Sequence, residues 1–312
     1  MSRTVNSEHC LDVTAKEVMR KQLWKIADFC GVQILTYALM SNHFHVLVRV
    51  PLKTEVPDAE LLRRFKVLYP KPTKYQTARI EVIEEKLKRG EAGAWRKQQL
   101  ALMGDVSQFM KLFKQRFAIW FNSNHGRHGP FWCERFKSVL VEGRANVLTT
   151  MAAYIDLNPV RAGLAVDPKD YRFCGYAEAV AGKQNARDGI AVVVTGESGN
   201  SLKWRDAHDA YRTRLFGAGA IERPGKASIS PGALEKVMAA KGTLPIASVL
   251  RCRARYFTSG VVLGSKAFVA GHLATYKKLT DCRRRPETHP LPEITDWGDL
   301  ATMRGFRKTP FG

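Results

Sequence analysis

The chain has 312 residues, 45% of them apolar, so its composition excludes a disordered protein and leaves room for two domains. Its 50 lysines and arginines against 29 aspartates and glutamates give a net charge of +21. This excess favours a polyanionic partner, nucleic acid first and an anionic membrane surface second. No apolar run approaches the roughly 18 residues of a membrane span, and six scattered cysteines without a C-x-x-C pair favour reduced thiols in a cytoplasm.

The N-terminal part predicts a helix followed by a β-hairpin. Thr14 and Glu17 form a capping box, apolar residues then recur at helical spacing, and Gly31 is a natural end. The stretches "VQILTYALM" and "HFHVLVRV" are typical of two strands, and the "SN" between them predicts a tight turn. Only "MSRTVN" precedes the helix, which is short for a strand.

The middle of the chain predicts an insertion and three further elements. Residues 58–104 are highly charged and predict surface helices, with a functional arm as the alternative. Asp105 caps the next helix, which has an apolar face. The stretch "ERFKSVLVE" then predicts a strand, and a helix follows from about Arg144 to Asn158, where Pro159 stops it.

The remaining chain predicts a linker and an accessory region. Residues 183–225 contain a Gly-, Asn- and Ser-bearing stretch that indicates a connector. Residues 226–312 carry 15 lysines and arginines against 6 acidic residues, a net +9. We expect a mostly helical module that binds DNA, and a scaffold for a protein partner is the alternative.

Two histidines on one strand form the first candidate site. Residues two apart on a strand point to the same face, so His43 and His45 share a face while Phe44 points to the other. Two neutral imidazoles placed in this way can chelate one cation. The same pattern also fits two polar residues on the wet face of a sheet. A rival pair, His125 and His128, lies in a Gly-rich loop that nothing obvious rigidifies.

A tyrosine and an amide form the second candidate site. In "MAAYIDLNPVRAGL", Asn158 follows Tyr154 by four residues, so both side chains share one flank of a helix. A phenol and an amide aligned in this way suit a nucleophile and a metal ligand. They equally suit a boundary tyrosine packed on the sheet and an asparagine that ends a helix before proline.

The predicted order of helix, strand, strand, helix, strand, helix, with one strand before it, is that of a ferredoxin-like α+β fold with an antiparallel sheet and helices on one face. The stretches "LTYALMSNHFHVLVRVP", "FMKLFKQRFAIWFNSNHGRHGPFWCERFKSVLVE", "YIDLNPVRAGL" and "DYRFCGYAEAV" occur in this order. Over residues 1–182 the chain therefore resembles the REP-associated tyrosine transposases, a branch of the single-tyrosine HUH transposases of the insertion-sequence type.

This resemblance implies an HUH endonuclease-type domain at residues 1–182 and a role for each candidate residue. His43, His45 and Asn158 would bind the metal, and Tyr154 would be the nucleophile. The implied substrate is single-stranded or hairpin DNA, such as a repetitive extragenic palindrome, and the implied product is a 5′-phosphotyrosine link with a free 3′-OH. The resemblance also implies a bacterial cytoplasmic protein that acts in DNA transposition and recombination. Its oligomeric state, monomer or homodimer, stays open.

Three features depart from the family pattern. The first strand is shorter than in the family, where it begins several residues before the position of Ser2. Asp156 stands where many relatives have another residue, often histidine. The insertion and the C-terminal region lie outside the common core. The short first strand keeps a second hypothesis open, a catalytically silent protein that binds DNA hairpins, and charge alone allows an RNA-binding protein.

The chemistry of the donor set favours Mg²⁺ or Mn²⁺, because two imidazoles and one amide leave open positions for phosphate oxygens and water. Basic residues near the candidate site would hold phosphates without reading sequence. Phe131 and Trp132 would stack unpaired bases, or alternatively pack in the core. The basic residues expected to contact DNA are Lys111, Lys114, Arg116, Arg135, Lys137, Arg144 and Arg161.

Overall fold

A computed structural model describes residues 1–51, 55–70, 80–196 and 202–244, and beyond them three short strands and a few helical positions. The chain divides into two compact units. Unit 1 comprises residues 1–179 and 183–243, and unit 2 comprises residues 180–182 and 244–312. All candidate site residues lie in unit 1.

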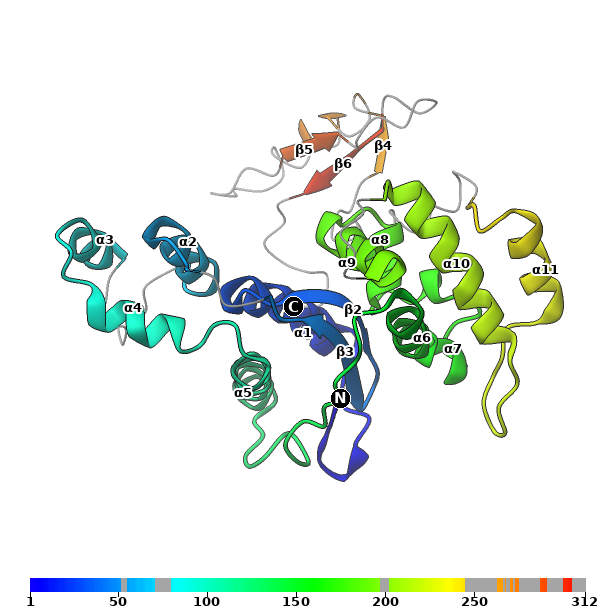
Figure 1. Cartoon of the computed structure of the whole chain (residues 1–312), viewed down its shortest axis with the longest axis horizontal. Helices are drawn as coiled ribbons and strands as arrows, with labels where there is room; N and C mark the ends of the chain where they lie inside the picture. The colour runs from blue at the N-terminus through cyan, green and yellow to red at the C-terminus, as the bar shows by residue number, and fades with distance from the viewer. Residues whose placement is uncertain are drawn as a thin grey trace. The chain divides into compact units, whose positions relative to one another are not determined.

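Unit 1 contains a small antiparallel sheet, as the α+β prediction requires. Its strands are β1 (Ser2–Arg3), β2 (Gln33–Leu39) and β3 (His43–Arg49), in the order β1-β3-β2. Figure 1 shows β2 and β3 side by side. The predicted hairpin is confirmed, with Leu39 opposite Phe44. The segment before the first helix does form a strand, but only two of its residues pair with β3.

Helices surround this sheet and make up most of unit 1. Asp12, not Thr14, caps the first helix, because its carboxylate accepts a hydrogen bond from the Ala15 N–H at 2.7 Å. Gly31 ends that helix with a φ of 65°, and Asp105 caps the α5 helix, both as predicted. The helices are α1 (Val13–Cys30), α2 (Asp58–Leu68), α3 (Ile80–Lys88), α4 (Gly93–Leu100), α5 (Val106–His125), α6 (Ala145–Asp156), α7 (Asn158–Arg161), α8 (Gly175–Val180), α9 (Gln184–Thr195), α10 (Trp204–Ala220) and α11 (Pro231–Ala239). Single 3₁₀ turns lie at Val5–Ser7 and Pro168–Asp170.

Helices cover both faces of the sheet, so the expectation of helices on one face is wrong. Phe44 points toward α5, where its ring lies 5.2 Å from that of Phe113. The neighbouring His45 points to the opposite face, where its ring meets Tyr154 of α6. The physical reason is that β3 is apolar on both faces, with Val46 and Leu47 both packed against helices, so each face requires cover.

The predicted strand "ERFKSVLVE" forms no regular strand, and this prediction is wrong. Only the residues at its start lie alongside β1. The backbone N–H of Cys133 donates to the carbonyl of Arg3, and Met1 and Lys137 exchange backbone hydrogen bonds of 2.9 Å. Beyond Lys137 no strand in the described part of the chain lies beside this segment. A strand needs a neighbour for its backbone groups, and in the described part of the chain β1 bonds to this segment only as far as Lys137.

Pro159 does not stop the tyrosine helix, contrary to the prediction. Leu157 keeps helical angles after α6, and α7 follows directly with Pro159 in its first turn. Proline is tolerated there because the first N–H groups of a helix have no intrahelical partner.

Residues 183–225 form α9 and α10 where a linker was expected. Gly189 lets α9 approach the backbone of β2 closely, since a Cβ at this position would lie 2.5 Å from the carbonyl oxygen of Leu35. The side chain of Thr149 in α6 also donates to the carbonyl of Val193 in α9. Of the stretch around 182 to 201 that suggested a connector, residues 184–195 form α9 and residues 197–201 lie outside the described residues.

Unit 2 differs from the expectation of a mostly helical region. Its described strands are β4 (Leu263–Ser265), β5 (Glu287–Pro290) and β6 (Leu300–Arg304), which form an antiparallel sheet in the order β4-β6-β5. Basic helices were expected in residues 245–286, most of which lie outside the described residues. The predicted DNA-binding module therefore also lies mostly outside the described residues.

Candidate functional site

Three aromatic side chains meet where β3 faces α6. The ring centroids of His43 and His45 are 5.2 Å apart, as the two-residue strand period requires. The ring of Tyr154 lies edge-on to His45 with a centroid distance of 5.7 Å. Tyr154 is 47% exposed, so its phenol remains open to solvent beside the histidine pair. The structure therefore brings Tyr154 of the second constellation into contact with His45 of the first.

Hydrogen bonds orient the candidate ligands. The Nδ1 atom of His43 lies 2.7 Å from the Oδ1 atom of Asn42, an acceptor, so it carries the proton and leaves a lone pair on Nε2. The side-chain amide of Asn158 donates through Nδ2 to the carbonyl of Tyr154 at 2.8 Å, which leaves its Oδ1 atom available for a cation. Asn42 is a supporting residue that the sequence pattern did not single out.

Both imidazoles are neutral near pH 7. Burial is the main cause that lowers the pKa of each to about 4. The positive charge of Arg3 adds to this effect on His43, and the mutual influence of the two rings adds to it on His45. A neutral imidazole is the form that binds a metal, so these pKa values suit a cation site.

The donor set of this site is small. Within the described ranges, no three His, Cys, Asp or Glu side chains gather around one point. The ligand set expected from the sequence for a divalent cation is the two imidazoles, the amide oxygen of Asn158 and oxygen atoms from substrate or water, and of these the two imidazoles lie side by side. Such a ligand set leaves coordination positions that oxygen atoms would fill. It therefore suits Mg²⁺ or Mn²⁺ better than Zn²⁺, which in structural sites prefers a closed tetrahedral set.

The surroundings of the histidine pair are basic. Arg3 lies opposite His43 in the β1–β3 register, and both Arg3 and Lys226 are close enough to depress the pKa of His43. Neither residue was among the expected DNA-binding residues, because only the folded chain brings them to the strand. Their charges would attract a phosphate to the side of the sheet where Tyr154 lies.

The two aromatic residues expected to stack bases pack in the core instead. Phe131 is 2% exposed and contacts Phe117 and Phe121, with the Phe121 ring 4.5 Å away. Trp132 lies edge-on to Phe44 and donates through its indole N–H to the carbonyl of Lys114. Core packing, the alternative expected for these residues, is therefore what the structure shows for Phe131, while Trp132 packs against the core but is only partly buried.

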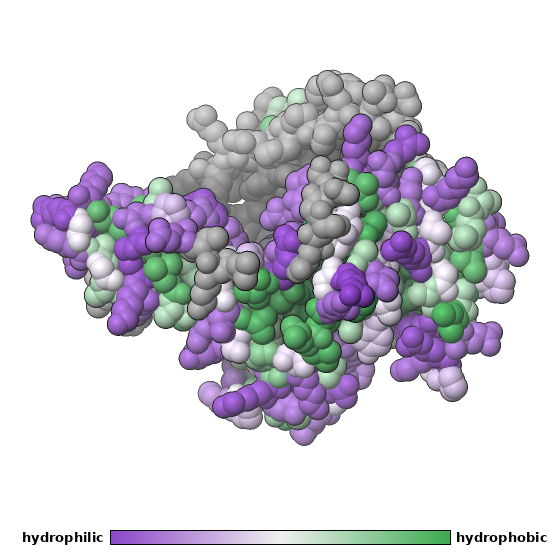
Figure 2. All heavy atoms as spheres, viewed as in Figure 1, coloured by the Kyte–Doolittle hydropathy of each residue, from purple (hydrophilic) through white to green (hydrophobic). Residues whose placement is uncertain are grey.

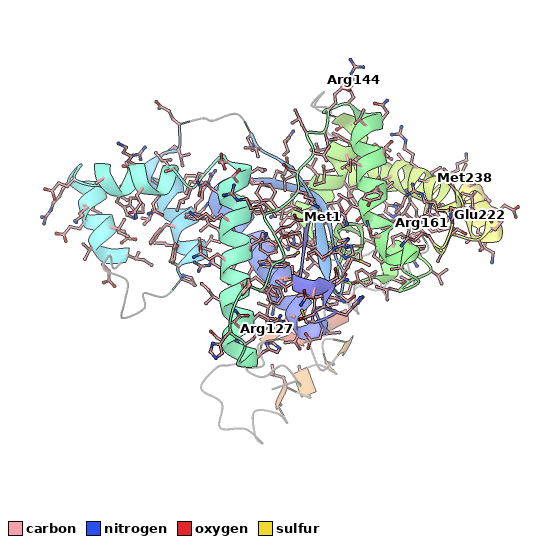
Figure 3. The ribbon with its side chains drawn as sticks, turned by 90° about the horizontal axis from the view of Figure 1, so that it is seen from below. Met1, Arg127, Arg144, Arg161, Glu222 and Met238 are labelled. Carbon is pink, nitrogen blue, oxygen red and sulfur yellow. The ribbon has the colours of Figure 1, made fainter. Side chains whose placement is uncertain are left out.

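Several of the expected DNA-binding cations have structural contacts. Arg116 lies over the ring of Tyr69 at 5.1 Å, and Arg161 donates to the carbonyls of Ala218 and Ala227. Lys114 donates to the carbonyl of Glu134. In Figure 3, Arg144 and Arg161 lie toward opposite ends of the region formed by α6 and α7.

The other expected cations are exposed. Lys111 and Arg135 are solvent-accessible, Lys137 pairs with Glu134 at 2.9 Å, and Arg144 pairs with Glu142 at 2.7 Å. Exposed ion pairs of this kind are weak and exchange readily for a phosphate. His125 of the rival pair was expected in a loop but is the last residue of α5, and it has a packing role because its ring stacks on Phe121 with a centroid distance of 4.0 Å.

A buried polar network lies behind the candidate nucleophile. The carboxyl of Asp156 in α6 accepts hydrogen bonds from Thr36 at 2.8 Å, Tyr211 at 2.6 Å and the backbone N–H of Tyr176. Asp156 is fully buried, and burial raises its pKa to about 7 against the opposing effect of these bonds. The network ties the helix that carries Tyr154 to β2, α8 and α10.

Comparisons with protein-family models, with curated proteins and with solved structures find no match to this chain. In the described part of the chain, no helix has the length and apolar content needed to cross a bilayer. The candidate site therefore stands on the sequence pattern and on the geometry given above.

Proposed function

We propose that the protein is a metal-dependent transposase that cleaves and rejoins single-stranded DNA at hairpins through a 5′-phosphotyrosine intermediate. The observation that carries this proposal is the placement of an exposed phenol, Tyr154, beside two neutral imidazoles, His43 and His45. Residues 133–137 add support, because they lie beside β1 and a ferredoxin-like HUH sheet would have its fourth strand beside its first.

The reaction follows from the chemistry of these groups. The phenol oxygen of Tyr154 attacks the scissile phosphorus in line with the leaving 3′ oxygen, and the bond from phosphorus to that oxygen breaks. The phenol proton is lost to solvent and the 3′ oxygen gains a proton, which yields a free 3′-OH. Because the phosphotyrosine retains the energy of the phosphodiester bond, a 3′-OH can rejoin it without ATP.

A bound divalent cation would polarise the scissile phosphate and neutralise its developing charge. The protein's own contribution is to hold both imidazoles neutral on one strand face and the phenol exposed on a helix that packs on that face. Arg3 and Lys226 would help to bind the neighbouring phosphates.

The test is incubation of the full chain with a single-stranded oligonucleotide that folds into an imperfect hairpin, together with Mg²⁺ or Mn²⁺. We expect a protein–DNA adduct that survives denaturing electrophoresis, and its loss in Tyr154→Phe. Tyr69→Phe is a matched control, because Tyr69 packs against Phe65, with a ring centroid distance of 4.8 Å, in a different part of unit 1. Adducts that persist in Tyr154→Phe would refute the assignment.

One observation favours a second candidate, a catalytically silent protein that regulates through hairpin binding. The segment after Lys137, which was expected to be a strand of the sheet, forms no strand in the described part of the chain. Hairpin binding without any adduct in either metal would support this candidate and oppose the enzyme.

A further inference from the structure

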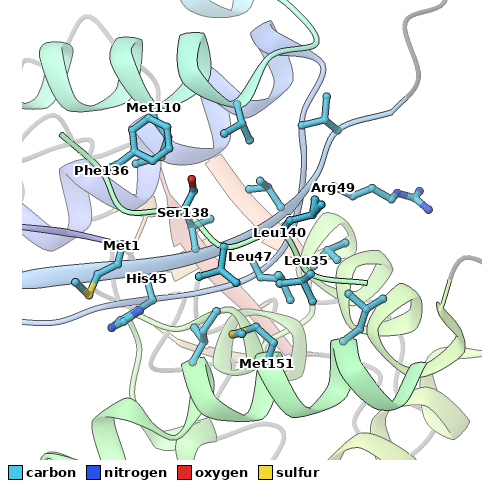
Figure 4. Close-up of a pocket in the computed structure, with 18 of the residues that line it drawn as sticks. Met1, Leu35, His45, Leu47, Arg49, Met110, Phe136, Ser138, Leu140 and Met151 are labelled. Atoms are coloured by element: carbon cyan, nitrogen blue, oxygen red, sulfur yellow. The ribbon is translucent and has the colours of Figure 1, made fainter. Parts of the chain in front are cut away.

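The two imidazoles of the candidate site are held in different ways. His45 lines a cavity of about 740 Å³ together with Met1, and Figure 4 shows both side chains at one end of it. His43 does not line this cavity. Its ring is oriented instead by Asn42, whose Oδ1 atom lies 2.7 Å from Nδ1 of His43. The orientation of the Asn42 amide therefore decides which nitrogen of His43 carries the proton.

The turn that carries Asn42 is enclosed by residues 4–12, the segment between β1 and α1. The backbone N–H and the hydroxyl of Thr4 both donate to the carbonyl of Asn42, at 2.9 and 3.0 Å. The N–H of Leu11 donates to the carbonyl of Ser41 at 2.9 Å. In Figure 1 the segment is the dark blue loop below the N label, and Figure 2 shows mainly hydrophilic side chains at that end of unit 1. The segment thus fixes the backbone of the turn and leaves polar side chains around it.

Two acceptors in this segment fix the amide of Asn42. Its Nδ2 atom lies 3.1 Å from the carbonyl oxygen of Ser7 and 3.3 Å from Nε2 of His9. A carbonyl oxygen only accepts hydrogen bonds, so the atom beside Ser7 must be the amide nitrogen, and the amide oxygen must face His43. The two N–H groups of the amide are then divided between Ser7 and His9, and every polar atom of the Asn42 side chain has a partner.

The backbone that presents the Ser7 carbonyl is unusual. Asn6 and Ser7 have φ angles of 54° and 55°, in the left-handed region that residues other than glycine seldom adopt. Such conformations persist where their surroundings enforce them, and they are frequent beside functional sites. The segment therefore keeps a costly conformation in which its carbonyl meets the amide of Asn42.

The same geometry fixes the tautomer of His9. Because Nε2 of His9 accepts from Asn42, the proton of its neutral ring lies on Nδ1. This Nδ1 atom is 2.7 Å from the hydroxyl oxygen of Ser41, which accepts the hydrogen bond. Every donation then runs in one direction, from His43 to Ser41 through the two side chains between them. Hydrogen bonds aligned in this way strengthen one another.

We propose that His9 is a positioning residue for the candidate cation site, which by accepting from Asn42 holds the proton of His43 on Nδ1 and keeps Nε2 of His43 free to bind the metal. If the amide flipped, its N–H groups would face His43, the proton would move to Nε2 and the lone pair there would be lost. The inference rests on the proposed function for the use of the cation. The tautomer of His43, however, is a property of the metal-free protein and can be measured without any cleavage.

The test is nitrogen NMR of the imidazoles in the metal-free full chain, with the His43 signals assigned by their loss in His43→Gln. The wild type should show the proton of His43 on Nδ1. His9→Phe keeps an aromatic ring but removes the acceptor, and because His9 is exposed the fold tolerates the change. The ratio of the Nε2-protonated to the Nδ1-protonated form of His43 should rise about threefold to tenfold, the factor that one hydrogen bond supplies. The apparent dissociation constant for Mn²⁺, measured by electron paramagnetic resonance of the free ion, should rise as the Nδ1-protonated fraction falls.

Three further variants separate positioning from a loss of structure. His9→Gln supplies an acceptor oxygen in place of Nε2 and should restore most of the wild-type ratio. Ser41→Ala removes the acceptor that fixes the tautomer of His9, so it should shift the ratio in the same direction as His9→Phe. Glu8→Gln weakens the 2.7 Å ion pair of Glu8 with Arg127 in the same segment without touching Asn42, so it should leave the tautomer of His43 unchanged.

Two results would overturn the proposal. An unchanged tautomer ratio in His9→Phe would show that Ser7 alone holds the amide of Asn42. An equal change in Glu8→Gln would show that the effect comes from loosening of residues 4–12 and not from the acceptor on His9. The expected tautomer shift in a protein that forms no DNA adduct would uphold the role of His9 and refute only the proposed function.

Discussion

The ring of Tyr154 in α6 lies 5.7 Å from the ring of His45 in β3, although 108 residues separate them in the chain. The contact exists because α6 packs on the face of the sheet opposite to α1 and α5. It makes an exposed phenol the immediate neighbour of a neutral imidazole, and the predictions below begin from this pair.

Loss of either histidine should impair cleavage without impairing hairpin binding. His43→Ala and His45→Ala each remove one imidazole ligand, so we expect cleavage to require far more Mn²⁺ or to fail. Adduct formation measured against Mn²⁺ concentration checks this. Wild-type rates in His45→Ala at low metal would remove the metal role from this residue.

Asn42→Ala should give a weaker form of the same defect. The Asn42 side chain fixes the proton on Nδ1 of His43, and its loss frees the ring to adopt the other tautomer. We expect an increase of roughly 10- to 100-fold in the metal concentration needed, as is typical when a supporting partner of a ligand is removed. An unchanged requirement would show that Asn42 does not orient the ligand.

The histidine pair should make folding stability fall in acid. The folded pKa of each ring is about 4, below the ordinary 6.5, so between these values the unfolded chain binds protons that the folded one does not. The contribution of the pair to the free energy of unfolding is complete above about pH 6.5 and is lost as pH falls toward 4. Urea unfolding of metal-free His43→Gln/His45→Gln at several pH values, compared with wild type, should show this difference, and parallel curves would contradict it.

Asp156 should act in the opposite direction. Its folded pKa of about 7 lies above the ordinary 3.8, so the folded protein retains a proton that the unfolded chain releases. The free energy of unfolding therefore falls as pH rises from about 4 to 7, and Asp156→Asn should abolish this part of the pH dependence. Asp156→Ala should cost about 3 kcal/mol, because the hydroxyls of Thr36 and Tyr211 lose their acceptor. Thermal denaturation of both variants separates the charge effect from the loss of hydrogen bonds.

Two of the expected DNA-binding cations should respond differently to truncation. Lys111 is exposed on α5, so Lys111→Ala should weaken hairpin binding and lower the slope of log affinity against log salt by about 1. Arg161 donates to two backbone carbonyls, so Arg161→Ala should lower stability by about 1–2 kcal/mol and leave the salt slope unchanged. The opposite pattern would place the DNA against α7.

Local patterns determined much of unit 1. The hairpin, the helix capped by Asp105 and the shared face of His43 and His45 follow from strand and helix periods that act over a few residues. The alignment of Tyr154 with Asn158 is of the same kind, because a helix places residues four apart on one flank and α7 continues α6 past Leu157. These features depend on near neighbours, which the sequence displays directly.

Contacts between distant segments decided the rest. The sequence could not show that Phe131 and Trp132 would be buried against α5, or that Asp156 would meet Thr36 and Tyr211, because burial depends on which surfaces pack together. Residues 138–142 have the composition of a strand but form none, since a strand is stabilised by hydrogen bonds to a neighbour that β1 is too short to provide. Sequence by itself determined the chemistry of the side chains and their local spacing, whereas tertiary packing alone decided which of them meet.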